Sequence, residues 1–489
     1  MLVRTASLIN EGRGPRTCTE RALWQWWRLS RLAGMERGRD RRMGRRGRHE
    51  VTIDRSRSDF DSLVSATSFG AQDPGCRPEI LILAKNIVDV RAAVRLAKAR
   101  NWRIACCSGG HSWSQNHIRA GGMLIDLSRL NEITVEPNDR TATVGPGCLS
   151  GDLDAALARH ALFFPVAHAY TVGLGGFLLQ GGFGWNSRMT GLACESVIAV
   201  DVVLADGRLV HASETENSDI LWAARGAGPG FFGIVVRFHL RLHARPRFTG
   251  MKMQVFRLRH MEELLRWAET ISAQVSPKVE FQMMFNRKAL GIFAPGIEVA
   301  TPVLADSRAE ARDLLSFIDK GPLRPKASLT LPLIPLSLRR IMKAAEKIVF
   351  LPRTRWHCDN IWLDGPVERA LPVLRRAAEL QPSSPSHMLW MNWNPRTRQR
   401  PDMAFSLEGS TYIALYGGLR GQPRSPEQET WATDMTRQLE PFSLGSQLAD
   451  ENLARRPARF MAPANLQRLS VLRSRYDPDN RFFSYGHEQ

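Results

Sequence analysis

The sequence predicts an α+β fold with a second domain built on an antiparallel sheet, and three observations lead to that prediction. From about residue 78 onward, short apolar runs alternate with amphipathic segments in a strand–helix–strand order. Residues 171–184, TVGLGGFLLQGGFG, hold six glycines in fourteen positions. Near Arg245-Pro246 glycine becomes rarer and longer alternating segments begin. A chain of 489 residues is also long enough for two domains of ordinary size.

The composition is that of an ordinary globular protein, with 43% hydrophobic and 24% charged residues. No run of about 18 uncharged apolar residues occurs, so no membrane span is expected. The formal net charge is +19, which is typical of some nucleic-acid-binding proteins. However, the chain has 58 arginines and only nine lysines, a bias that a GC-rich coding sequence also produces. We therefore expect no nucleic-acid partner.

Residues 1–50 form a basic arm with 13 arginines and five acidic residues. The run RGRDRRMGRRGR at 37–48 cannot bury apolar area, so the arm is predicted to be disordered. Met35 and Met43 leave a later start of the chain open. A targeting peptide is a second interpretation, against which the five acids count, and DNA binding by the arm is a third.

The cysteines indicate neither a disulfide framework nor a structural zinc site. Their number is odd, and no CxxC spacing occurs. Reduced thiols in the cytoplasm are the expectation. The seven are Cys18, Cys76, Cys106, Cys107, Cys148, Cys194 and Cys358.

Residues 51–245 are predicted to form one domain of short strands and helices. Asn86 is expected to cap a helix whose buried face is Val90, Ala93, Val94 and Ala97. Asp206-Gly207 is expected to be the turn between two later strands. The predicted strands are 79–84, 102–107, 123–127, 141–144, 197–204 and 233–242, and a second helix is predicted over 151–160.

Residues 246–448 are predicted to form a second domain, an antiparallel sheet with helices over one face. A helix that contains Ala309, Leu314, Leu315 and Ile318 is expected after the first two of its strands. A last segment, 449–489, contains a helix that ends in YDPDN. The strands predicted in the second domain are 279–286, 297–304, 388–393, 403–407 and 412–416.

The strand-to-loop junction CCSGGHSW, residues 106–113, is the first candidate site. Gly109 and Gly110 let the backbone adopt positive φ and approach a ligand closely. Successive N–H groups in such a turn bind anions such as a pyrophosphate. His111 follows directly and lies in no cluster of Cys or His, so no metal role is expected. Taken by itself, a histidine beside two glycines is more often an ordinary turn residue.

The glycine-rich segment 171–184 strengthens the case for a large ligand. Neither this segment nor the first loop is a GxxxxGK[ST] phosphate loop, and Gly173-Leu174-Gly175-Gly176 is not a GxGxxG fingerprint. A close-packed glycine turn is the alternative interpretation. Two glycine loops in one domain favour FAD or a similar dinucleotide lying along bare backbone.

The chain resembles the FAD-linked oxidoreductases of the vanillyl-alcohol-oxidase superfamily, in its berberine-bridge-enzyme-like branch. The resemblance covers about 75–245 and 450–489 and rests on motifs in the right order. They include SGGHSW, MLIDLSRLNEITVEP, ATVGPG, TVGLGGFLLQGGFGWNSRMTGL, LWAARGAGPGFFGIVVRF and RLSVLRSRYDPDNRFF. It implies a PCMH-type FAD-binding domain of two subdomains, a substrate domain with an antiparallel sheet covered by helices, and a tail that returns to the FAD-binding domain.

The resemblance implies that His111 is bonded to the 8α-methyl carbon of the flavin. Ala169 stands where members with a second bond carry cysteine, so attachment through His111 alone is expected. Val172 occupies a position associated with oxygen access, which favours O2 as electron acceptor. Family members commonly carry Arg at the position of Cys107. The implied FAD-binding residues are His111, Cys107, Ser108, Gly109, Gly110, Ser112, Thr171, Val172, Gly173, Gly176, Gly181, Gly182, Gly184 and Val235.

The catalytic base is predicted less directly. Tyr412 and Tyr416 alternate on one face of a predicted strand, with Glu408 nearby, and ordinary sheet packing is the alternative. The family often places a tyrosine near the position of Gln447. Trp390 and Trp393 are interpreted as core residues or as walls of a substrate pocket.

These observations predict an FAD-dependent oxidase or dehydrogenase for a small molecule such as an alcohol, a sugar or a secondary metabolite. A flavin-binding protein without turnover is the alternative.

Overall fold

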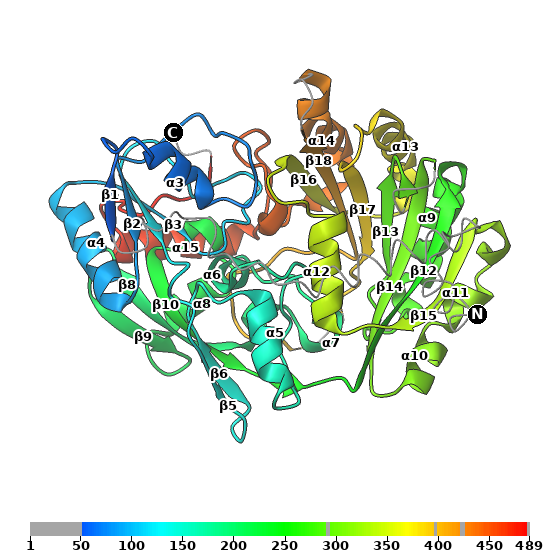
Figure 1. Ribbon diagram of the computed structural model, residues 1–489, viewed down its shortest axis with the longest axis horizontal. Coiled ribbons are helices and arrows are strands. Elements are labelled where there is room, and N and C mark those ends of the chain that lie inside the picture. The colour runs from blue at the N-terminus through cyan, green and yellow to red at the C-terminus, as the bar shows by residue number, and fades with distance from the viewer. Residues whose placement is uncertain (1–50, 290–293, 396–398, 421–425, 487–489) are drawn as a thin grey trace, which may run out of the picture.

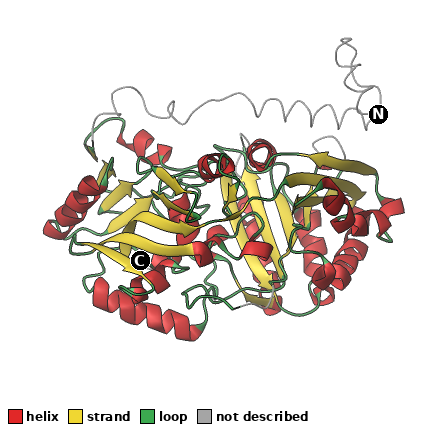
Figure 2. Cartoon of the chain, turned by 90° about the horizontal axis from the view of Figure 1, so that it is seen from below, coloured by secondary structure: helices red, strands yellow, loops and turns green. Residues whose placement is uncertain are grey.

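The computed structural model describes residues 51–289, 294–395, 399–420 and 426–486. The predicted basic arm, 1–50, lies outside the described residues. Figure 1 shows two lobes beside each other, with the sheets of the first half of the chain in one and a large sheet in the other. In Figure 2 the strands lie centrally and most helices lie around them, which is the expected α+β arrangement.

A four-stranded sheet begins the first lobe, in the order β1-β2-β4-β3. Its strands are β1 (Thr52–Asp54), β2 (Ile80–Leu83), β3 (Ile104–Cys107) and β4 (Met123–Asp126), with β2 and β3 parallel to β4. Helix α4 (Ile87–Ala99) crosses from β2 to β3, and Asn86 accepts a hydrogen bond from Asp89 N as predicted. The four residues predicted to form its buried face are all buried, so this helix is confirmed in detail.

An antiparallel five-stranded sheet follows, in the order β5-β6-β10-β8-β9. Its strands are β5 (Ile133–Glu136), β6 (Thr141–Val144), β8 (Val197–Leu204), β9 (Leu209–Ser213) and β10 (Gly233–Arg241). Helices α5 (Ser150–Ala158), α6 (Leu174–Leu179) and α8 (Ser218–Ala224) belong to the same lobe. The Asp206-Gly207 turn connects β8 to β9, not to β10 as the sequence analysis implies. The prediction differs because it does not include the half-exposed edge strand β9.

The second lobe is built on one antiparallel sheet, in the order β15-β12-β14-β13-β17-β18-β16-β19. One face of this sheet packs against helices α9 (Met261–Ile271), α10 (Arg308–Leu314), α11 (Ser316–Lys320), α13 (Leu371–Leu380) and α14 (Pro426–Leu439). This confirms the predicted antiparallel sheet with helices over one face. The strands are β12 (Phe248–Arg257), β13 (Gln282–Asn286), β14 (Gly296–Ala305), β15 (Leu329–Pro335), β16 (Arg355–Leu363), β17 (His387–Asn392), β18 (Thr411–Leu419) and β19 (Ser443–Gly445).

Alternation along these strands divides the side chains between the two faces. On β13, Met283 and Phe285 are buried under the helices, whereas Gln282 and Met284 are only partly buried on the opposite face. Helix α12 (Leu338–Ile348), capped by Ser337, stands between the two lobes in Figure 1.

Two predictions for the second lobe are wrong. Residues 403–407 form no strand, because Ala404 N and Phe405 N donate to Trp222 O and Arg225 O at the end of α8 instead of joining a sheet. The single helix predicted around Ala309–Ile318 is two helices, α10 and α11, separated at Leu315.

The end of the chain packs on the first lobe. Helix α15 (Pro463–Tyr476) lies there, and Phe482 forms a parallel bridge with Ile104 at the start of β3. Arg473 of α15 donates to Gly230 O. In the described residues no helix has both the length and the apolar character needed to cross a membrane. The six described cysteines are free thiols, and Cys18 lies outside the described residues.

Candidate functional site

The two predicted glycine loops touch each other. Gly109 lies in the loop after β3, and Gly173 lies directly before α6. A Cβ added to Gly109 would clash with the backbone N and Cα of Gly173, and a Cβ added to Gly173 would clash with Gly109. Only hydrogen side chains allow this approach, so glycine at both positions brings the two loops into one wall.

Gly110 shows why the first loop needs a second glycine. Its φ is +69°, a left-handed conformation that other residues rarely adopt. A Cβ there would also overlap Thr67 O. The turn that presents His111 therefore depends on both the conformation and the small size of Gly110.

Both loops line one cavity of about 440 Å³. Gly176 lies in its wall with no atom within 4 Å of where a Cβ would stand, so a ligand can approach that backbone closely. The cavity extends from the first lobe to the open face of the eight-stranded sheet. Of the residues predicted to bind FAD, those in its lining are Cys107, Ser108, Gly109, Gly110, His111, Ser112, Val172, Gly173, Gly176 and Val235.

Four other predicted residues lie outside the cavity lining. Gly181, Gly182 and Gly184 face protein instead, since an added Cβ would meet the Phe405 ring, Ala193 Cβ and the Pro165 carbonyl respectively. Gly181 and Gly182 also have positive φ, of +103° and +76°. Glycine at these three positions is therefore explained by turn geometry and packing.

Thr171, the fourth, contacts His111 directly. His111 Nε2 lies 2.9 Å from Thr171 Oγ1, and the His111 ring stacks on Phe69 with centroids 4.1 Å apart. Thr171 N and Oγ1 both donate to Glu346 Oε1 of α12, at 2.6 and 2.5 Å. These contacts fix the orientation of the imidazole at the cavity wall.

Ala169 lies in the cavity lining, at the position predicted to lack a second flavin bond. Cys148 and Cys194 are buried outside the lining, and burial raises the pKa of both thiols. The Cys107 thiol is directed at Thr67 O, 3.4 Å away.

A carboxylate that the sequence analysis did not single out lies at the centre of the polar part of the cavity. Tyr412 and Tyr416 of β18 both donate to Asp450 Oδ2, at 2.5 and 2.8 Å. Trp113 Nε1 donates to Asp450 Oδ1 at 2.6 Å. All four residues line the cavity. Strand β18 presents both tyrosines because residues four apart in a strand share a face.

Burial, reinforced by the charge of Asp450, raises the pKa of both Tyr412 and Tyr416 well above the ordinary range. Both phenols are therefore protonated at neutral pH. They are arranged as hydrogen-bond donors to a carboxylate, and Asp450 is the group in this cluster that can accept a proton.

Buried polar side chains of β16 hold the turn that carries Asp450. Asn360 Nδ2 donates to Asp450 O and to Gln447 O, and its Oδ1 accepts from Gln447 N. Next to it, Arg456 forms a fully buried ion pair with Asp359. Gln447 itself lines the cavity. The sequence signal for Asp450 is its place in SLGSQLADEN, close to Gln447, where the family often has a tyrosine.

The other catalytic and pocket candidates are packing residues. Trp390 is buried in the core beneath the helices, and Trp393 donates to Glu408 Oε2 at 2.6 Å. Glu408 also pairs with Arg400. Both tryptophans and Glu408 lie outside the cavity lining, so the packing interpretation holds for them.

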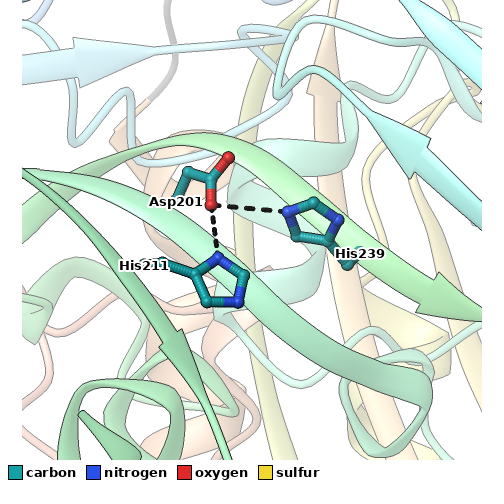
Figure 3. A group of neighbouring side chains, drawn as sticks. All are labelled: Asp201, His211 and His239. Carbon is teal, nitrogen blue, oxygen red and sulfur yellow. Dashed lines mark hydrogen bonds and ion pairs between the residues drawn. The ribbon is translucent and has the colours of Figure 1, made fainter. Parts of the chain in front are cut away.

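In the described part of the chain, one group of His and carboxylate side chains has ligand atoms close enough for a metal ion. Figure 3 shows Asp201, His211 and His239, from β8, β9 and β10, with both imidazoles directed at the carboxylate. Burial by itself raises the pKa of Asp201, but hydrogen bonds from His239 and His211 outweigh it and lower the pKa to about 2. Arg237 lies 3.6 Å from the same carboxylate. The group lies outside the cavity lining and is satisfied as an ion-pair cluster.

The residues present fit a flavin dinucleotide. The cavity has bare glycine backbone on the first lobe, an imidazole at its wall and a carboxylate with two phenols on the sheet. A long ligand with a pyrophosphate needs such backbone access and such N–H groups.

Comparisons with known proteins agree with this fit. Residues 78–213 match the family described as FAD binding domain. FAD-linked oxidoreductase ptmO of Penicillium ochrochloron is 30% identical over 88% of this chain and 95% of its own length. The fungal relative nodO of Hypoxylon pulicicidum is also 30% identical, over 84% of this chain and 92% of its own.

Solved structures share the fold at lower identity. 6-Hydroxy-D-nicotine oxidase of Arthrobacter nicotinovorans matches with a TM-score of 0.76 and 21% identity, over 88% of this chain and 96% of its own. BBE-like 1 of Physcomitrella patens matches with a TM-score of 0.75 and 17% identity, over 94% and 98%. The pollen protein Phl p 4, described as a glucose dehydrogenase, matches with a TM-score of 0.75 and 17% identity, over 92% and 97%.

The similarity to ptmO and nodO extends over 88% and 84% of this chain respectively. With the PCMH-type fold and a cavity that fits a dinucleotide, the chain belongs to the FAD-linked oxidoreductases and is an FAD-dependent enzyme that shares its fold with BBE-like 1.

Proposed function

We propose that this enzyme is an oxidase that removes a hydride and a proton from a small alcohol-bearing substrate, with FAD held covalently by His111. The observation that carries the proposal is the single cavity that contains both the glycine loops and the cluster of Asp450, Tyr412 and Tyr416. When bound, the flavin supplies the two-electron acceptor, and the protein supplies position and proton transfer.

Asp450 is the proposed final proton acceptor, and the tyrosines connect it to the substrate. A substrate hydroxyl that donates to Tyr412 Oη loses its proton to that oxygen, while the phenol passes its own proton to Asp450 Oδ2. The C–H bond breaks as the substrate carbonyl forms, and the bound flavin would accept the hydride that leaves the carbon. Because the phenol starts and ends protonated, its raised pKa is no obstacle to this role.

The position of His111 supports covalent attachment. Its ring stacks on Phe69 and is hydrogen-bonded to Thr171, and it follows two glycines in the cavity wall. These two contacts hold the imidazole in one orientation, which a single stable bond to a ligand requires. Ala169 in the lining offers no thiol for a second bond.

Val172 in the cavity lining supports O2 as the electron acceptor. Wild-type Phl p 4 is described as a glucose dehydrogenase, and a variant of it with isoleucine replaced by valine is described as a glucose oxidase. This enzyme carries valine without any substitution at the position that the sequence resemblance links to oxygen access.

The test begins with a panel of alcohols and sugars, in which flavin bleaching under argon and hydrogen peroxide release in air are measured. We expect Asp450→Asn to slow flavin reduction by roughly 10²- to 10⁴-fold, because the proton acceptor is lost. Asp434→Asn, an exposed residue of α14, is the matched control and keeps the normal rate. Normal reduction by Asp450→Asn contradicts the assigned role.

The covalent bond is tested separately by acid precipitation. The wild-type precipitate retains the yellow colour, and His111→Ala releases its flavin into the supernatant. A coloured His111→Ala precipitate disproves the attachment site. A yellow protein that no substrate in the panel bleaches would instead be a flavin-binding protein without turnover.

A further inference from the structure

The open face of the eight-stranded sheet is a broad apolar wall of the cavity. Register places Met253, Ala300, Gln282, Met391 and Tyr412 as successive cross-strand neighbours on β12, β14, β13, β17 and β18. At the usual strand spacing of about 4.8 Å, this row reaches about 19 Å from Tyr412 to Met253. All five residues line the cavity.

A second row lies beside the first and is also mostly apolar. Met284 pairs with Leu389 on one side and with Glu298 on the other, and all three line the cavity. Met284 and Leu389 are only partly buried, whereas their neighbours Met283 and Met388 point into the helix-covered core. The side chains of Met284 and Leu389 can therefore contact a ligand in the cavity.

The polar side chains of this wall already have partners within the protein. Gln282 Nε2 donates to Glu280 Oε2 at 2.9 Å, and Glu298 Oε1 accepts from Asn286 Nδ2 at 3.1 Å. A carbohydrate would need several hydrogen-bond partners along its length, because a hydroxyl that is desolvated without a partner weakens binding. The rows therefore favour a ligand without hydroxyls along its body.

Helix α12 adds a further apolar surface to the same cavity. Ile341, Ala344, Ala345 and Ile348 line it, at spacings that fall on one helical face. Ile348 is 37% exposed although it is a large apolar residue. Glu346 of the same helix is bonded to Thr171 and so keeps α12 beside the His111 loop.

We propose that the substrate is an elongated lipophilic alcohol, with a polyprenyl or fused-ring body along the methionine rows and one hydroxyl at Tyr412 and Asp450. This inference rests on the proposed function for the reacting end of the molecule. The methionine rows account for the body, since removal of apolar surface from water favours binding in proportion to the area buried. Methionine side chains also adapt to irregular apolar shapes.

The experiment titrates flavin-loaded protein with geraniol, farnesol and geranylgeraniol, and with D-glucose and cellobiose as polar probes. The dissociation constant is read from quenching of tryptophan fluorescence and from the shift of the flavin absorption band, neither of which needs turnover. We expect the prenols to bind with affinity that rises with each isoprene unit, and the sugars to bind far more weakly. Binding of the sugars with equal or higher affinity overturns the proposal, as does failure of all three prenols to bind.

Two matched variants test whether farnesol binds at the methionine rows. Met284→Gln is expected to weaken farnesol binding about tenfold, because one apolar contact is replaced by an amide. Met189→Gln, at a 46% exposed methionine outside the cavity lining, is expected to leave it unchanged. Equal effects of both variants, or none from Met284→Gln, overturn the location.

The two proposals fail separately. Farnesol that binds without bleaching the flavin under argon, while dithionite bleaches it, contradicts the proposed oxidation and upholds the lipophilic site. Glucose that bleaches the flavin while farnesol does not bind upholds the oxidation and contradicts the lipophilic site.

Discussion

Burial determines the protonation of several side chains around the cavity. It raises the pKa of Tyr412 and Tyr416, and it lowers the pKa of His117 and His387 to about 4. His117 is held neutral beside Thr67 and Ser68, and His387 stacks on Tyr416 with centroids 4.6 Å apart. A neutral His387 adds no positive charge that would compete with the tyrosines for Asp450.

The two buried histidines predict a loss of stability in mild acid. An unfolded histidine takes up a proton below its ordinary pKa of 6.5, whereas these two stay neutral in the fold until about pH 4. The contribution of these two histidines to stability is therefore full above pH 6.5 and falls as the pH drops toward 4, by up to about 3 kcal/mol for each histidine.

Urea midpoints measured across this pH range test the prediction. His117→Asn is expected to reduce the slope, and His160→Asn, at an exposed position, is expected to leave it unchanged. A slope that stays the same in His117→Asn contradicts the assignment of a neutral buried histidine at that position.

At the scale of elements, the two glycine loops form one structure through two different uses of glycine. Gly109 is needed because the loops touch, and Gly176 leaves open space at the cavity wall. Alanine at these two positions should therefore impair different properties of the protein.

Gly109→Ala is expected to lower both the melting temperature and the flavin content, because its Cβ clashes with Gly173. Gly176→Ala is expected to fold normally and to lose flavin affinity alone, since its Cβ enters space that the ligand needs. The ratio of absorbance at the flavin band to that at the protein band, together with thermal melts, separates the two outcomes. A normal flavin ratio in Gly176→Ala contradicts the proposed close approach.

Elements with a clean pattern were predictable from sequence, and elements set by distant partners were not. The apolar run of β8 and the face of α4 around Val90 were found because local periodicity specifies them. Strand β16 was missed because Asp359 and Asn360 interrupt its apolar pattern. These two residues bond to Arg456 and to the turn of Gln447, partners almost ninety residues or more away.

The candidate site also has one part that the sequence predicts and one part that it does not. Residues around His111 carry a local glycine motif, so the sequence pointed to them. Asp450 has no local signature, and its meeting with Tyr412 and Trp113 depends on the packing of three separate segments. The predicted strand 403–407 failed for a related reason, because its backbone bonds to Trp222 O and Arg225 O of the other lobe.

At the scale of the whole molecule, buried polar contacts join the two lobes. Arg188, in the short helix α7 (Ser187–Thr190), donates to the carbonyl oxygens of Val275, Ser276 and Val279 in the second lobe. Its guanidinium fork reaches three acceptors at once, which a shorter or apolar side chain cannot do.

Arg188→Met is expected to lower the melting temperature by roughly 5 °C, because it removes the donors of buried carbonyl groups. Differential scanning fluorimetry measures the change, and Arg437→Met, in an exposed pair with Asp434, is the control with little effect. Equal melting temperatures for both variants contradict the role of Arg188 in joining the lobes.

The bond from Trp113 to Asp450 has a consequence for recombination between relatives. Trp113 comes from the loop of His111, Tyr412 from the large sheet and Asp450 from the segment after it, so three distant segments of the chain supply the proposed reactive centre. A chimaera that exchanges only the sheet inherits foreign partners for Asp450, whereas grafts that exchange the wall while retaining Tyr412 and Tyr416 redirect selectivity without rebuilding the chemistry. Shuffled libraries of this family should therefore place a crossover between β17 and β18, which separates the methionines of the wall from the two phenols.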